Sequence, residues 1–282
     1  MSALDPQELD ARERTALETL LKRLGDDEFV FAERYTEWQV RAPSLESDIA
    51  LANNAQDELG HARLWYDILL DLDYEEREIL YERSPEEFRH STLVELPFEE
   101  GGWADAILRH YLYDAAERLR LEALEGSSHP KIADRVGKIQ SEERYHLEHA
   151  QNWMERLADD GAGTKRLQDA LDRLFPHALT LFIPVDPDIE DDIVDLGLRT
   201  ATLEELGEEW LSIVVPFLDS LDLAVPADSE EGFEVADEML PDQRGRDGSH
   251  TDDWFDLYDE FTHTYRKLGR SETTAIMERP EQ

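Results

Sequence analysis

Two segments of the chain each place a glutamate and a histidine three residues apart, at Glu58 and His61 and at Glu143 and His146. Both pairs interrupt apolar stripes that repeat every three or four positions, which is the period of one helix face. The stripe residues are Leu51, Ala55, Ala62 and Trp65, and then Ile132, Val136, Ile139, Ala150, Trp153 and Leu157. A buried charge must be paired or bound, and carboxylate and imidazole are strong metal ligands. The two pairs therefore predict a metal site between helices.

The Glu-x-x-His spacing alone is weak evidence, because about one match is expected by chance in a chain this rich in glutamate. Four matches occur, and the apolar pattern separates them. Glu87 and His90 lie in a segment without helical apolar periodicity. Glu260 and His263 flank an apolar stripe without occupying it, so we expect both of these pairs to face solvent. For the other two pairs, the alternative to metal binding is a buried polar cluster that is satisfied by arginine and backbone groups.

Two further inward carboxylates are needed to complete a site between four helices. Glu28 continues an apolar stripe of the first helix, and Asp114 continues one of the third. Ferritin-like bundles hold two iron or two manganese ions with this arrangement of ligands. We predict a di-iron site, with manganese not excluded, whose ligands are Glu28, Glu58, His61, Asp114, Glu143 and His146. Glu117 and Glu122 are expected to point away from the site. His110 and His149 are expected to lie beside the site or at the surface.

Helical periodicity dominates the chain and predicts an all-α fold. The expected helices cover residues 7–39, 44–71, 102–125, 130–158, 163–183, 203–222 and 250–269. The stretches 184–202 and 226–249 are predicted to be surface loops. Residues 1–282 are interpreted as a single ferritin-like domain, with a core four-helix bundle at about 7–158 and a C-terminal helical extension at about 163–282.

The chain is strongly acidic and has no cysteine. It carries 68 acidic and 28 basic residues, for a net charge of −40, and the acidic residues are spread along its whole length. This balance argues against binding to nucleic acid or to an anionic membrane, and it favours a halophilic protein in which salt screens the repulsion. With no long apolar run and no signal-peptide pattern, we expect a cytoplasmic protein. Without cysteine, carboxylate and imidazole are the only strong metal ligands available.

Several motifs give the chain a resemblance to a known family. They are Arg41-Ala42-Pro43-Ser44-Leu45 leading into Gln56-Asp57-Glu58-Leu59-Gly60-His61, then Ser141-Glu142-Glu143-Arg144-Tyr145-His146, and Trp153-Met154-Glu155-Arg156-Leu157. With these motifs the chain resembles, nearly end to end, the oxygenase subunits of ring 1,2-phenylacetyl-CoA epoxidase. That enzyme combines a catalytic A-type subunit, which carries a di-iron site, with a structural C-type subunit. The C type is favoured, with the A type as the alternative, by Glu37-Trp38 and by Gly248-Ser249-His250-Thr251.

The resemblance implies ligands, chemistry and partners. Carried over residue by residue, the catalytic subunit's ligand pattern falls on the same six residues that the apolar stripes select. Well-known C-type subunits have lost several of these ligands, so this chain either retains a metal site of its own or is itself catalytic. The implied chemistry is insertion of one oxygen atom from dioxygen into the aromatic ring of phenylacetyl-CoA at two ferrous ions. The implied partners are the catalytic A-type subunit and a separate reductase, and phenylacetyl-CoA is met through the complex.

Two other functions stay open. One is a non-catalytic scaffold that orders the A-type subunit, and the other is an iron-storage or peroxide-scavenging ferritin relative. The long extension after residue 160 argues against the second. Apolar stretches from Leu174 to Pro184 and from Trp210 to Leu221 predict a subunit interface. CoA phosphates are expected to contact the partner or arginines such as Arg118 and Arg120.

Overall fold

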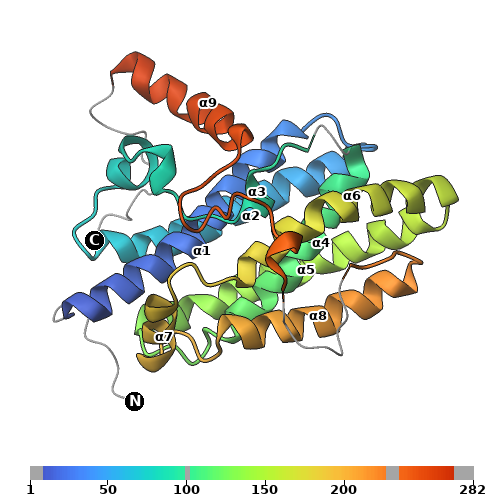
Figure 1. Ribbon diagram of the computed structural model, residues 1–282. Helices are drawn as coiled ribbons and strands as arrows, with labels where there is room; N and C mark the ends of the chain where they lie inside the picture. Colours follow the sequence, from blue (N-terminus) through green and yellow to red (C-terminus); the bar gives the residue numbers. More distant parts are fainter. Residues whose placement is uncertain (1–8, 99–101, 227–234, 270–282) are drawn as a thin grey trace.

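A computed structural model describes residues 9–98, 102–226 and 235–269 of the chain. Its core is a bundle in which α1 (Ala11–Glu37) packs along α2 (Leu45–Leu70) and α4 (Gly102–Glu122) packs along α5 (Pro130–Ala158). Contacts between α2 and α5 join the two pairs (Figure 1). The described residues contain helices and loops but no strand. The predicted all-α, ferritin-like fold is therefore confirmed.

Local sequence signals set the ends of the bundle helices. The Asp10 side chain accepts a hydrogen bond from the N–H of Glu13, whose carboxylate accepts one from the N–H of Asp10, so α1 begins with a capping box. The Ser44 side chain caps α2 by accepting a hydrogen bond from the N–H of Ser47. Pro130 occupies the first turn of α5, where its missing N–H leaves no bond unmade. These boundaries agree with the predicted ones within a few residues, although the predicted start at residue 7 lies outside the described residues.

The C-terminal extension covers the bundle from two sides. It contains α6 (Gly161–Leu179), α7 (Pro187–Asp195), α8 (Leu203–Ser220) and α9 (Asp252–Leu268). Helices α6 and α8 pack on α4, and α7 packs on α1. The last described helix, α9, returns to the segment between α2 and α4, where it contacts the short helix α3 (Thr92–Glu95) (Figure 1). The prediction of a loop at 184–202 is wrong for residues 187–195, which form α7. Asp186 caps this helix and Pro187 begins it.

The apolar stretches of the extension are buried within this chain. Phe175 of α6 stacks on Trp210 of α8, with ring centroids 5.5 Å apart, and the Trp210 indole N–H donates to the carbonyl oxygen of Leu112 in α4. Leu174 and Val214 are fully buried as well. The prediction that these stretches form a subunit interface is therefore wrong for the side chains that cover α4. None of the described helices is long and apolar enough to span a membrane.

Candidate metal centre

The middle of the bundle contains a buried group of acidic and imidazole side chains, called the donor cluster below. Its members are Glu28 of α1, Glu58 and His61 of α2, Asp114 of α4, and Glu143 and His146 of α5. Each of them is at most 2% exposed. The structure thus brings together all six residues that the sequence predicts as ligands, and their role as ligands stays a prediction.

Atoms of the donor cluster face one another at the spacing of ligands around an ion. His61 Nδ1 lies 3.3 Å from Glu143 Oε1 and 3.7 Å from Oε2 of both Glu28 and Glu58. His146 Nδ1 lies 3.4 Å from Glu143 Oε1 and 3.7 Å from Glu58 Oε1. Two ligands that each lie about 2.1 Å from one ion are separated by about 3–3.5 Å, whereas an N–H···O hydrogen bond centres near 2.9 Å. The two distances to Glu143 lie in the range for ligands of one ion, and the other three lie just above it.

The facing atoms of the donor cluster also lack hydrogen bonds. Within the described part of the chain, no hydrogen-bond partner exists for either carboxylate oxygen of Glu28, Glu58 or Glu143, nor for Nδ1 of His61 or His146. One unpaired buried polar group costs about 1–3 kcal/mol, so such groups are rare in folded proteins. A whole set in one place is compatible with a metal site. Oxygen and imidazole donors suit iron or manganese.

The charge balance of the donor cluster also favours a bound cation. Burial, together with the charges of Glu28 and Glu143, raises the pKa of Glu58 well above its usual range. Burial also raises the pKa of Asp114 to about 6. Burial alone would raise the pKa of Glu143 too, but contacts with His146 and His61 hold it well below its usual range. The carboxylates outnumber the imidazoles, so the cluster must take up protons or bind positive ions.

Each histidine of the donor cluster is oriented by an acidic residue of the other helix. His61 Nε2 donates to Glu142 Oε2 at 2.9 Å, and His146 Nε2 donates to Asp57 Oδ2 at 3.2 Å. Because Nε2 carries the proton, the Nδ1 lone pair is left to face the cluster. The apolar stripes do not mark Asp57 and Glu142. A signal exists, since each one immediately precedes the glutamate of a Glu-x-x-His pair.

Asp114 lies beside a buried histidine. His110 Nε2 is 2.9 Å from Asp114 Oδ2 and 3.1 Å from the carbonyl oxygen of His146. The Nδ1 atom of His110 contacts the hydroxyl group of Tyr35, which is fully buried. His110 therefore links α1, α4 and α5 at the edge of the donor cluster. This is the place beside the site that the sequence predicts for it.

A second carboxylate of α4 is buried near the donor cluster. The sequence predicts that Glu117 points away, and this is wrong, because Glu117 is 0% exposed. Burial, only partly offset by Arg120, raises its pKa well above its usual range, and the charge of Glu28 adds to the effect. The physical reason is that α4 is buried on almost every side, so its apolar pattern does not mark one inward face. Glu122 is exposed, as predicted.

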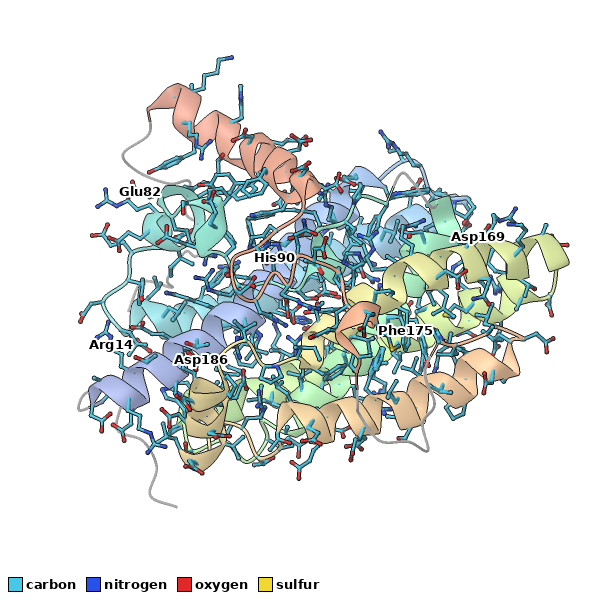
Figure 2. The ribbon with its side chains drawn as sticks, viewed as in Figure 1. Arg14, Glu82, His90, Asp169, Phe175 and Asp186 are labelled. Carbon is cyan, nitrogen blue, oxygen red and sulfur yellow. The ribbon has the colours of Figure 1, made fainter. Side chains whose placement is uncertain are left out.

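A second buried cluster contains His90, Glu95 of α3 and His250, which precedes α9. His90 is 0% exposed, so the prediction that it faces solvent is wrong, while Glu87, Glu260 and His263 are exposed as predicted. His90 Nε2 and His250 Nδ1 donate to the same oxygen, Glu95 Oε2, at 2.6 and 2.7 Å. Figure 2 shows His90 beside the loop that leads into α9. The sequence gives no local signal for this cluster, because His250 comes from a distant part of the chain.

A groove of about 690 Å³ between α4 and α5 reaches the donor cluster. Glu143 contributes to its lining, together with Arg118 and Arg144. Glu143 therefore borders both the groove and the donor cluster, while its carboxylate oxygens are buried. Arg118 is partly exposed and can contact an anionic group, whereas Arg120 is buried against Asp27 and does not fit the predicted contact with CoA phosphates.

Comparisons with known proteins agree with these features. Residues 1–271 match the family described as phenylacetic acid catabolic protein. The chain is 31% identical over 250 residues to the C subunit of 1,2-phenylacetyl-CoA epoxidase from Escherichia coli (strain K12), covering 87% of this chain and 94% of that protein. It is 27% identical over 231 residues to the A subunit of the same enzyme, covering 80% of this chain and 74% of that protein.

Proposed function

Because the chain belongs to the phenylacetic acid catabolic protein family, we propose that it is an oxygenase-component subunit of a multicomponent 1,2-phenylacetyl-CoA epoxidase in aerobic phenylacetate catabolism. The C-type role is supported by higher identity, at 31% against 27%, and by coverage of 94% of the C-type relative against 74% of the A-type relative. In this role the chain pairs with a catalytic A-type subunit and works with a separate reductase. Phenylacetyl-CoA then binds to the assembled complex.

The proposal includes a di-iron centre in this chain, with manganese as the alternative. The observation that carries it is the set of unpaired, buried donor atoms in the donor cluster. Glu28, Glu58, His61 and Glu143, whose ligand atoms lie within 4.8 Å of one another, would hold the metal together with Asp114 and His146. When bound, two iron ions supply the redox chemistry that activates dioxygen.

The chain's own residues hold and shield this centre. Glu142 and Asp57 fix the ring orientation of the two histidines, which keeps Nδ1 directed at the ions. Phe31, Tyr35 and Tyr113 form a buried aromatic wall, in which the ring centroid of Phe31 lies 4.3 Å from that of Tyr35 and 4.8 Å from that of Tyr113. Burial of this wall keeps water away from one side of the centre.

A second candidate is the catalytic A-type role itself. The observation that favours it is the groove between α4 and α5, which leads from the surface to Glu143. A purely structural partner has no need for a groove that ends beside its metal centre. In the catalytic role, the groove admits the acyl group of the thioester, and Arg118 contacts a CoA phosphate at its mouth.

Metal analysis of the full chain tests the proposal. The protein is purified in molar salt, because a net charge of −40 is expected to require screening, and is examined by elemental analysis and Mössbauer spectroscopy. We expect two iron ions per chain, lost in Glu58→Gln/Glu143→Gln and retained in the exposed control Glu87→Gln/Glu260→Gln. A folded wild-type protein that binds neither iron nor manganese would overturn the metal centre. Turnover of phenylacetyl-CoA with a reductase, in the presence and absence of an A-type partner, separates the two roles.

A further inference from the structure

Four arginines converge on one small cavity outside the donor cluster. They are Arg23 of α1, Arg120 of α4, Arg199 between α7 and α8, and Arg246 in the loop before α9. Their side chains are only 5–11% exposed. The rest of the cavity wall is apolar and consists of Leu20, Leu24, Leu124, Leu181, Ile183 and Leu203. In a chain with 28 basic and 68 acidic residues, this concentration of buried positive charge is unexpected.

The carboxylates around the cavity do not balance the arginines. Asp27 Oδ2 accepts hydrogen bonds from Arg120 at 2.8 Å and from Arg246 at 2.7 Å. Glu190 accepts one from Arg199 at 2.8 Å and another from Arg23. Four guanidinium groups thus share two carboxylates.

A third carboxylate near the cavity does not neutralise the remaining positive charge. Glu117 Oε2 lies 2.9 Å from Arg120 Nη2. If Glu117 counts as a full negative charge, three carboxylates face four guanidinium groups, and one positive charge remains unbalanced. Arginine cannot release its proton in a protein, so this excess of positive charge favours a bound anion.

The cavity also offers an unused donor and a limited space. Arg23 Nε is buried and has no hydrogen-bond partner within the described residues. The cavity volume is about 30 Å³. One water-sized sphere needs about 10–15 Å³, so the space accepts a monatomic ion but not a phosphate ester.

We propose that the cavity between Arg23, Arg120, Arg199 and Arg246 binds a small inorganic anion of halide size, such as chloride. The anion completes the counter-charge of the four guanidinium groups. It also joins α1 and α4 of the bundle to the α7–α8 connection and to the loop before α9. Asp27, which is held by two of these arginines, is the chain neighbour of Glu28 in the donor cluster. The anion therefore acts as an ionic link between the bundle and its C-terminal extension.

Halide substitution tests this site in the full chain. Crystals grown in molar potassium bromide should show a bromide anomalous peak within hydrogen-bond distance of Arg23 Nε. In solution, the melting temperature should be about 2–4 °C higher in potassium chloride than in equimolar potassium gluconate, whose anion is too large for the cavity. Arg23→Gln should remove this difference. Arg12→Gln should keep it, because Arg12 also joins α1 to α7 but does so in solvent.

Either of two results would overturn the anion site. One is a cavity without an anomalous peak in molar bromide, which would mean that water alone fills it. The other is a chloride effect of equal size in wild type and Arg23→Gln. The bromide measurement needs only the wild-type protein, so it decides the question even where Arg23→Gln does not fold.

Discussion

Two buried clusters of glutamate and histidine lie in this molecule, and their atoms are spaced differently. In the donor cluster, imidazole nitrogens and carboxylate oxygens face one another at 3.3–3.7 Å without hydrogen bonds. In the cluster of His90, Glu95 and His250, the corresponding distances are 2.6 and 2.7 Å, and both contacts are hydrogen bonds. Residue type and burial are the same in both. Spacing and hydrogen bonding are what mark the first as a candidate metal centre and the second as a structural link.

The two clusters also differ in how their charge is balanced. His250 Nδ1 faces a carboxylate oxygen of Glu95, and its Nε2 lies 3.2 Å from the carbonyl oxygen of Phe88. Both nitrogens of His250 therefore face oxygen acceptors. The N–H of Thr251 donates to the other Glu95 oxygen at 2.7 Å. In this cluster both oxygens of the single carboxylate accept hydrogen bonds, whereas the donor cluster keeps an excess of carboxylates.

Removal of Glu95 is expected to have the largest effect on stability. Glu95→Ala leaves two buried imidazoles and one buried N–H without their acceptor, which should lower the free energy of unfolding by about 3–5 kcal/mol. Urea denaturation in molar salt measures this, with the exposed Glu87→Ala as control. Metal content should stay unchanged. Loss of metal with little loss of stability would reverse the assignment of the two clusters.

The same cluster should make the protein sensitive to acid. Burial and the charge of His250 lower the pKa of His90 to about 4, whereas an unfolded histidine titrates near 6.5. The unfolded chain therefore binds a proton that the folded chain excludes. This contribution, about 3 kcal/mol, is present above about pH 6.5 and is lost as the pH falls to about 4. Urea unfolding at stepped pH should show a flatter profile for His90→Gln, which keeps an N–H donor, and an unchanged one for His263→Gln.

The orientation of the donor-cluster histidines is expected to affect metal affinity rather than folding. Asp57→Asn weakens the acceptor that holds His146, so affinity for iron should fall about 10–100-fold. Competition with a chelator measures the change. Asp67→Asn, on the same helix but paired with Arg135, serves as control. Equal affinities for the two variants would show that Asp57 does not position His146.

The smallest effect is expected for Glu58→Gln in metal-free protein. Burial and the neighbouring carboxylates Glu28 and Glu143 raise the pKa of Glu58 well above its usual range, which favours its neutral form. The amide then replaces a neutral acid, and the unfolding free energy should change by less than about 1 kcal/mol. In metal-loaded protein the same substitution should remove bound iron. A large loss of stability after chelation would instead mean that Glu58 belongs to a satisfied polar core.

The sequence alone determined the bundle and the six residues of the donor cluster. Periodicity placed Glu58 and Glu143 on apolar faces, because α2 and α5 each have one side that meets the core and one side that meets solvent. A charged residue that points inward on such a helix can be recognised because it interrupts the apolar stripe. Periodicity also selected Glu28, although α1 is buried on every side from Leu24 to Ala32. The same logic correctly left Glu260 and His263 in solvent.

Tertiary structure alone decided the rest. Glu117 was misplaced because α4 is covered by α5, α6 and α8, and a helix buried all round has no pattern that separates inward from outward positions. His90 and His250 are far apart in sequence and meet only when the loop before α9 folds back on α3. The crossed pairs of Asp57 with His146 and Glu142 with His61 depend on the register between α2 and α5. Local spacing carries no information on such contacts, because they are set by how whole helices pack.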